Sequence, residues 1–189
     1  DEYMKKERDH QPHVGETPES VIAAVLNYSS NAVAAAAAAR PFVTKNRAEF
    51  ERLSNDAGCI QAMAENYSAK VKAAELVMRF EYSHDIRDME TAEKFLAESF
   101  ADYQKLARLG GDAYHFANSM QTSQRKIPFS GGAHGRGTNY LWSQLVPYYQ
   151  KELEDFQVRV KQLQANPHAE TAVDESKIKP WPAAPFTLL

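Results

Sequence analysis

The sequence predicts an all-α fold, in which four or five helices form an up-and-down bundle followed by an extended, proline-rich C-terminal tail. Apolar residues recur at steps of three and four over long stretches, which is the period of an amphipathic helix. No strand-like alternation of apolar and polar residues runs for any length before residue 180. Long helices joined by short connections typically pack antiparallel, so a bundle is the expected architecture.

The helical pattern divides the chain into three regions. Residues 1–16 are polar and aperiodic and predict an N-terminal arm, whereas residues 17–165 carry the helices. Residues 166–189 contain four prolines and no helical period, which is typical of an extended tail or a linker to a following domain. The chain starts at Asp1 rather than methionine and ends in an apolar run, so we expect a piece of a larger polypeptide.

The first predicted helix begins at Thr17-Pro18-Glu19, which offers a capping hydroxyl, a proline at the first helical position and a carboxylate in the first turn. The alanine run 34–39 has a high helix propensity and a narrow surface that a neighbouring helix can approach closely. Pro41 ends this helix, because proline cannot continue the hydrogen-bonded ladder.

The second predicted helix runs from about residue 45 to residue 82 and carries a regular heptad pattern. Two interpretations stay open. The pattern is either the internal core of a bundle or a coiled-coil interface with another chain. The seam consists of Phe50, Leu53, Ala57, Ile60, Ala64, Tyr67, Val71, Ala74 and Met78.

A third helix is predicted from about residue 88 to residue 109, where Gly110-Gly111 allows the chain to leave the helical conformation. A shorter helix is expected at 113–122.

The last predicted helix starts at Thr138 or Asn139 and ends at Asn166-Pro167, with a kink or a restart at Pro147. Its inward side chains are expected to be Trp142, Leu145, Tyr149, Phe156, Val160 and Leu163.

Composition excludes several functional classes. The net charge of −3 gives no overall attraction to nucleic acid or to an anionic membrane. Cys59 is the single cysteine, so an internal disulfide and a cysteine-based zinc site within one chain are excluded. No run of about 18 apolar residues occurs, so no membrane span is predicted. No cofactor is predicted either.

The loop 125–139, RKIPFSGGAHGRGTN, is rich in glycine and basic residues and has no carboxylate. Gly132 and Gly137 match the glycine spacing of a phosphate-binding P-loop. Thr138 and Asn139 stand where that motif needs lysine and a hydroxyl, and no strand precedes the loop. The P-loop and the dinucleotide-binding fingerprint are therefore both rejected.

A weaker binding hypothesis for this loop survives beside the alternative that its glycines merely connect two helices. Free amides at the start of the last helix, with basic side chains beside them, suit a phosphate, sulfate or uronate group. Aromatic residues around the loop suit a sugar ring. The predicted ligand-binding residues are Arg125, Lys126, His134, Arg136, Asn139 and Trp142, and no residue is assigned as catalytic.

A carboxylate-x-x-histidine spacing occurs twice, at Glu81 with His84 and at Asp112 with His115. Carboxylate-bridged di-iron bundles need two such pairs together with a carboxylate on each of two further helices. The first helix offers no carboxylate between Val21 and Arg40, so chance spacing explains the pairs and no metal site is predicted.

Two segments, 120–129 (MQTSQRKIPF) and 142–153 (WSQLVPYYQKEL), are similar to helical segments of large secreted bacterial proteins of polysaccharide metabolism. In those proteins a helical region lies between a catalytic domain and a β-sandwich. The resemblance implies a carbohydrate-related role, a periplasmic or extracellular location, and other domains of the same polypeptide as partners.

Three functional hypotheses follow. The first is a non-catalytic α-helical module, a scaffold or binding surface of a larger exported protein. The second is an enzyme or enzyme subdomain acting on an anionic or sugar substrate at the loop, with His134 as acid or base, Arg125 and Arg136 holding the anion, and Asp112 or His115 nearby. The third is a homo-oligomer that associates through the 50–78 seam.

Overall fold

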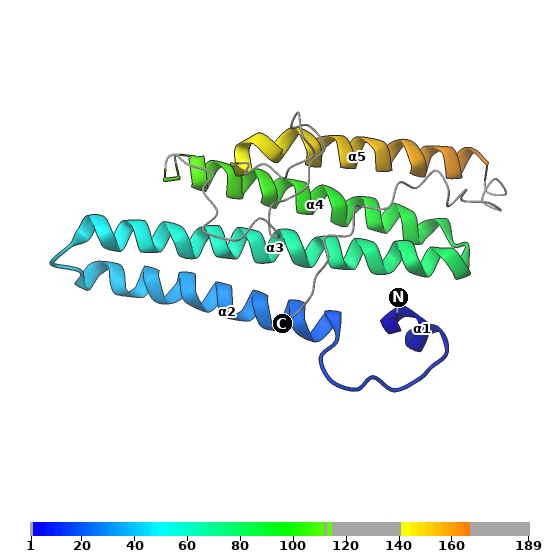
Figure 1. Cartoon of the computed structure of the whole chain (residues 1–189), viewed down its shortest axis with the longest axis horizontal. Helices are drawn as coiled ribbons and strands as arrows, with labels where there is room; N and C mark the ends of the chain where they lie inside the picture. The colour runs from blue at the N-terminus through cyan, green and yellow to red at the C-terminus, as the bar shows by residue number, and fades with distance from the viewer. Residues whose placement is uncertain (1, 112, 115–140, 167–189) are drawn as a thin grey trace, which may run out of the picture.

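The computed structural model describes residues 2–111, 113–114 and 141–166, and every regular element in these ranges is helical. The all-α prediction is confirmed (Figure 1). The elements are α1 (Glu2–Arg8), α2 (Pro18–Ala39), the short 3₁₀ helix η1 (Arg40–Phe42), α3 (Arg47–Ser83), α4 (Ile86–Gly111) and α5 (Trp142–Ala165). The predicted helix at 113–122 and the tail beyond Asn166 lie outside the described residues.

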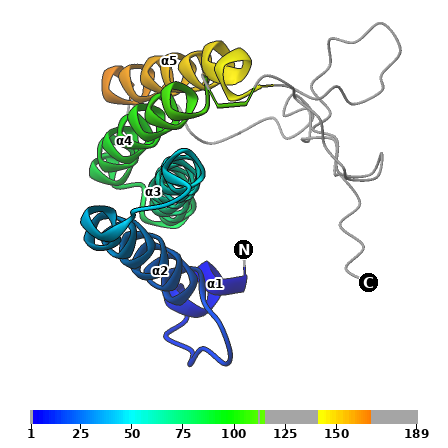
Figure 2. The same cartoon turned by 90° about the vertical axis from the view of Figure 1, so that its left-hand side faces the viewer.

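The four long helices alternate in direction, as an up-and-down bundle requires (Figure 1). Their main contacts join α2 to α3, α3 to α4 and α4 to α5, which are neighbours in chain order. Viewed along their length, these helices follow one another across the molecule, with α2 and α5 at opposite sides (Figure 2).

Helix α2 begins where the sequence predicts. The Oγ1 atom of Thr17 accepts a hydrogen bond of 3.1 Å from the amide of Ser20, and the Oγ atom of Ser20 accepts one of 2.9 Å from the amide of Thr17. This reciprocal pair satisfies two amides that the first turn leaves without helical partners. The helix passes into η1 at Arg40, next to Pro41.

Helix α3 is one continuous helix of 37 residues, as predicted. The large apolar residues at the middle of its heptad seam, however, lie outside the core. Leu53 is 53% exposed, Ile60 54% and Tyr67 49%. The buried positions are smaller side chains, Cys59, Ala62, Ala64, Ser68, Ala69 and Ala73, together with Phe80.

Helices pack on two sides of α3, which explains why small residues rather than the large seam residues are buried. Cys59 and Ala62 contact α4 and α5, whereas Ala64 and Ser68 lie on the opposite side of the helix, where α2 packs. Small residues allow both neighbours to approach closely. The larger residues of the seam then fall between the two contacts, so the internal-core interpretation of the seam is wrong for Leu53, Ile60 and Tyr67.

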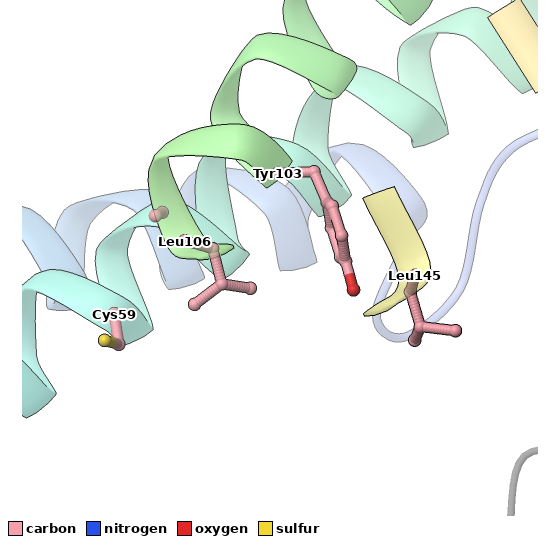
Figure 3. Close-up of a cluster of buried hydrophobic side chains, with 5 residues drawn as sticks. Cys59, Tyr103, Leu106 and Leu145 are labelled. Carbon is pink, nitrogen blue, oxygen red and sulfur yellow. The ribbon is translucent and has the colours of Figure 1, made fainter. Parts of the chain in front are cut away.

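The core lies between α3, α4 and α5 in two clusters. Figure 3 shows the first, in which Cys59 of α3, Tyr103 and Leu106 of α4 and Leu145 of α5 come together with Ala62. The second combines Phe80, Met89, Val160 and Leu163. Leu145, Val160 and Leu163 were predicted as inward residues of the last helix, and all three are buried. Helix α5 continues through Pro147 without a restart.

Polar contacts tie α4 to α3. The buried Asp88 forms an ion pair with Arg79 and accepts a hydrogen bond of 2.9 Å from the hydroxyl of Ser83. The Arg79 guanidinium holds the pKa of Asp88 below its usual value. Asn66 donates hydrogen bonds of 2.8 Å to both the carbonyl and the hydroxyl of Ser99, which is fully buried.

The N-terminal arm contains a helix that the sequence did not predict. Helix α1 buries Met4 and lies near the first turns of α2 (Figures 1 and 2). An ion pair of 2.8 Å between Lys6 and Glu2 supports its two turns. A helix of seven residues is too short to show a period, so the sequence pattern does not reveal it.

By length and composition, the segment Pro18–Phe42 is apolar enough to cross a membrane, with a mean hydropathy of 1.4. Only 11% of that window is buried, although α2 packs along α3. A single helix of this kind does not by itself indicate a membrane protein, because core helices of soluble proteins and signal sequences share this length and composition. The absence of a membrane span stays a prediction.

Candidate functional site

The glycine-rich loop from which a ligand site was predicted lies outside the described residues. Arg125, Lys126, His134, Arg136 and Asn139 all fall in this segment, so their roles stay predictions. Asp112 and His115, one of the two carboxylate-histidine pairs, also lie outside the described residues. Trp142 is the predicted ligand-binding residue that the structure describes.

Trp142 opens helix α5 and packs against the end of α4. Its ring meets that of Tyr114 edge to face, with 5.4 Å between centroids, and it lies directly over the α-carbon of Gly110. The Tyr114 hydroxyl donates a hydrogen bond to the carboxylate of Asp56 on α3, which raises the pKa of Tyr114 to about 12. Trp142 therefore contributes to packing between α4 and α5, and its role in ligand binding stays a prediction.

Tyr149 also packs against α4. Its ring stacks on that of Tyr103 with 3.8 Å between centroids, and the ammonium of Lys70 lies 4.2 Å from the Tyr149 centroid. Lys70 also forms an ion pair of 2.6 Å with Glu152. Trp142 and Tyr149, both predicted as inward residues of the last helix, thus have core contacts.

Neither a nucleophile nor a metal centre emerges from the described ranges. Cys59 is buried in the core cluster, and burial raises the pKa of its thiol. His84 is the C-terminal cap of α3 and lies edge-on to Phe80. Within the part of the chain that the structure describes, no three histidine, cysteine, aspartate or glutamate residues converge as metal ligands.

The described residues form a different candidate site, an open pocket of about 430 Å³ lined by α1, α2, α3 and α4. We call it the arm pocket, because α1 of the N-terminal arm forms one wall. Its charged side chains are Glu7, Glu19, Lys72, Glu75 and Arg79.

Apolar and aromatic side chains complete the arm pocket. Met4 is buried, and Tyr82 at the end of α3 is 39% exposed. The remaining apolar surface comes from Tyr3, Leu76 and Phe95, and the ammonium of Lys72 lies 5.6 Å from the centre of the Phe95 ring. The pocket therefore offers flat apolar surfaces beside polar groups, as ligand sites commonly do.

Glu75 is the most perturbed group in the arm pocket. Burial and a hydrogen-bonding contact with the carboxyl group of Glu19 raise the pKa of Glu75 to about 7. Two carboxyl groups this close repel each other when both are ionised, which favours the protonated form of Glu75. The Oε1 atom of Glu75 is enclosed, and no donor among the described residues reaches it.

Sequence patterns alone missed the arm pocket. Glu7, Glu19 and Glu75 come from three helices and look like ordinary solvated residues when each is considered on its own helix. No local pattern around Glu75 marks it as a pocket residue. The arm pocket also depends on α1, which was not predicted.

Among the solved structures, the chain is similar to a GH138 enzyme that targets pectin rhamnogalacturonan II. That enzyme is 39% identical in sequence to the present chain, with a TM-score of 0.77. The match covers 86% of this chain but 23% of that enzyme. No protein-family model and no curated protein matches the chain.

The chain thus spans about a quarter of the length of the enzyme that it matches. An identity of 39% over most of the chain extends the likeness beyond the fold to the sequence itself. The link to polysaccharide metabolism implied by the two helical segments is thereby confirmed in its coarser form: this chain is similar to part of a carbohydrate-active enzyme.

Proposed function

We propose that the chain is a non-catalytic α-helical module of a larger, exported protein that acts on a pectic polysaccharide. The observation that carries this proposal is the match of 86% of the chain to 23% of a GH138 enzyme. An alignment that uses nearly all of one chain and a small share of the other is expected of a module within a larger protein.

The module presents an apolar surface suited to a scaffold. Leu53, Ile60, Met63 and Tyr67 are 39–54% exposed and share one side of α3. We call this surface the α3 stripe. Exposed apolar side chains gathered in one place are typical of an interaction site. Since the matched enzyme continues well beyond the aligned part, we assign this surface to the other domains of the same polypeptide.

A domain exchange tests the module function. The aligned segment of the matched GH138 enzyme is replaced by the present chain, and release of sugar from pectin rhamnogalacturonan II is measured. We expect the chimera to keep its activity within about tenfold, because a module of the same fold restores the same support. The isolated chain is expected to release no sugar.

Variants of the α3 stripe sharpen this test. In the chimera, Ile60→Glu is expected to lower the melting temperature, because it places a charge in an interdomain contact. The same change in the isolated chain is expected to be nearly neutral, since Ile60 is 54% exposed there. Val158→Glu on α5 is the matched control, because Val158 is 53% exposed and lies off the stripe. An inactive but folded chimera, or equal effects of the two variants, would contradict the proposal.

The α3 stripe also favours a second candidate, a homo-oligomer formed through the 50–78 seam. Light scattering at micromolar concentration separates the two proposals. We expect a monomer. A dimer that Ile60→Glu dissociates would instead support self-association.

The enzyme alternative concerns residues outside the described ranges. Sugar release by the isolated chain, abolished by His134→Ala, would support that alternative and overturn the module proposal.

A further inference from the structure

The size and walls of the arm pocket suit one small ligand. Its volume of about 430 Å³ lies within the range of pockets that enclose small molecules. The walls come from α1, α2, α3 and α4, so the pocket exists only when these elements are assembled. Tyr82 and Phe95 belong to different helices and supply aromatic surfaces, whereas Glu19 and Glu75 supply hydrogen-bonding groups.

The groups that surround Glu75 carry charges of both signs. Helix α1 contributes Glu7, which is paired with His13 at 2.6 Å, and the hydroxyl of Tyr3. Helix α2 contributes Glu19, and α3 contributes Lys72 and Arg79, whose guanidinium is already paired with Asp88. The pocket residues of α4, Thr91 and Phe95, carry no charge. An anionic ligand would meet carboxyl groups from three helices, and a cationic ligand would meet Lys72.

The hydrogen-bonding groups of the arm pocket also favour a ligand that carries hydroxyl groups. The carboxyl oxygens of Glu19 and Glu75 accept hydrogen bonds, and the hydroxyls of Tyr3 and Thr91 both donate and accept. Hydroxyl groups match both roles, because each donates and accepts.

We infer that the arm pocket binds a single neutral sugar residue, whose hydroxyls bond to the carboxyl groups of Glu19 and Glu75 and whose ring packs on Tyr82 and Phe95. Sugar rings combine flat apolar faces with a rim of hydroxyls, and the pocket offers both complements. The inference rests on the proposed function for the choice of a sugar among hydroxylated ligands, whereas the preference for a neutral one is argued from the mixed charges of the pocket lining.

The test is titration of the ¹⁵N-labelled full chain with three monosaccharides near pH 6, followed by amide chemical shifts. L-Rhamnose is the neutral probe, galacturonate the anionic probe and glucosamine the cationic probe. We expect rhamnose to shift amides around Glu75 and Thr91 with a dissociation constant of about 1–10 mM. Galacturonate and glucosamine are expected to bind at least about tenfold more weakly.

Two variants make the assignment specific. Tyr82→Ala is expected to weaken rhamnose binding at least about fivefold, whereas Tyr67→Ala, on the same helix and 49% exposed, leaves it unchanged. For the native chain, binding should weaken as the pH rises through about 7, because Glu75 loses its proton and adds a negative charge to the pocket. Glu75→Gln keeps a donor and an acceptor and should bind rhamnose with no such dependence.

Three results would overturn the inference: no shift with rhamnose up to about 50 mM, tighter binding of either charged probe, or equal effects of the two tyrosine variants. Each can occur while the domain exchange succeeds, so failure of the pocket and failure of the module function are distinguishable.

Discussion

Two adjacent glycines at the end of α4 have different roles. A β-carbon on Gly110 would come within 2.6 Å of Cζ3 of Trp142, whereas one on Gly111 would meet nothing within 4 Å. Gly110 therefore lets the indole of α5 rest on the backbone of α4. The sequence predicted both glycines as a helix terminator, but in the structure both are helical.

Alanine substitutions separate these roles. Gly110→Ala is expected to lower the free energy of unfolding by about 1–3 kcal/mol, because Trp142 must move. Gly111→Ala is expected to raise it by about 0.5 kcal/mol, because alanine loses less backbone entropy in a helix. Chemical denaturation measures both. Equal destabilisation by the two variants would show that Gly110 is not a site of close contact.

Glu75 makes stability depend on pH. Its pKa is raised from 4.5 to about 7, so between these values the folded chain binds more protons than the unfolded chain. The contribution of Glu75 is thus fully present below pH 4.5 and is lost as the pH rises through about 7.

Glu75→Gln is expected to flatten this pH dependence. The variant should be more stable than the native chain near pH 8, by about 1 kcal/mol once solvent screening of the partly exposed group is included. Thermal unfolding at a series of pH values tests this. If the native chain loses no stability between about pH 5 and pH 8, the pKa of Glu75 is not raised in the folded chain.

The long helices contribute unequally to the core. Helix α4 buries nine residues, among them Met89, Ser99 and Leu106, whereas α2 buries only Ile22 and Ser29. Local opening free energy follows the number of buried contacts. Helix α2 should therefore open separately from α3, α4 and α5.

Hydrogen exchange detects this difference. Amides of α2 are expected to exchange with an opening free energy below that of α4, and Ile22→Ala should accelerate exchange in α2 while leaving α4 protected. The control is Tyr28→Ala, since Tyr28 lies on α2 and is 72% exposed. Equal opening free energies for α2 and α4 would place all four helices in one cooperative unit.

At the scale of the whole molecule, sequence periodicity predicted the elements better than their contacts. The bounds of α2 and α3 follow from Thr17, Pro41 and a long apolar period, which are local signals. The buried side of α3 does not follow from local signals. Its alanines, which contact two neighbouring helices, carry a weaker apolar signal in the sequence than the exposed Leu53 and Ile60. Burial depends on which helices pack on both sides, and a single helix pattern does not contain that information.

The same distinction explains the candidate site. Trp142 was predicted both as an inward residue and as a ligand-binding residue, and its packing on Gly110 and Tyr114 follows the first prediction. The arm pocket needs residues from four helices, including α1, which has no readable period. Sequence reasoning finds sites made of one segment and misses sites assembled from several.

The order of the helix contacts also bears on how the chain folds. Because α2, α3 and α4 each pack against the next helix along the chain, most of their contacts are close in sequence, and such topologies form in microseconds to milliseconds. Helix α5 differs, since the residues from 112 to 141 separate it from α4. Its docking joins parts of the chain that are far apart in sequence and brings Trp142, Leu145 and Val160 into the core. We therefore expect a fast α2–α4 intermediate and a later step in which α5 completes the hydrophobic core.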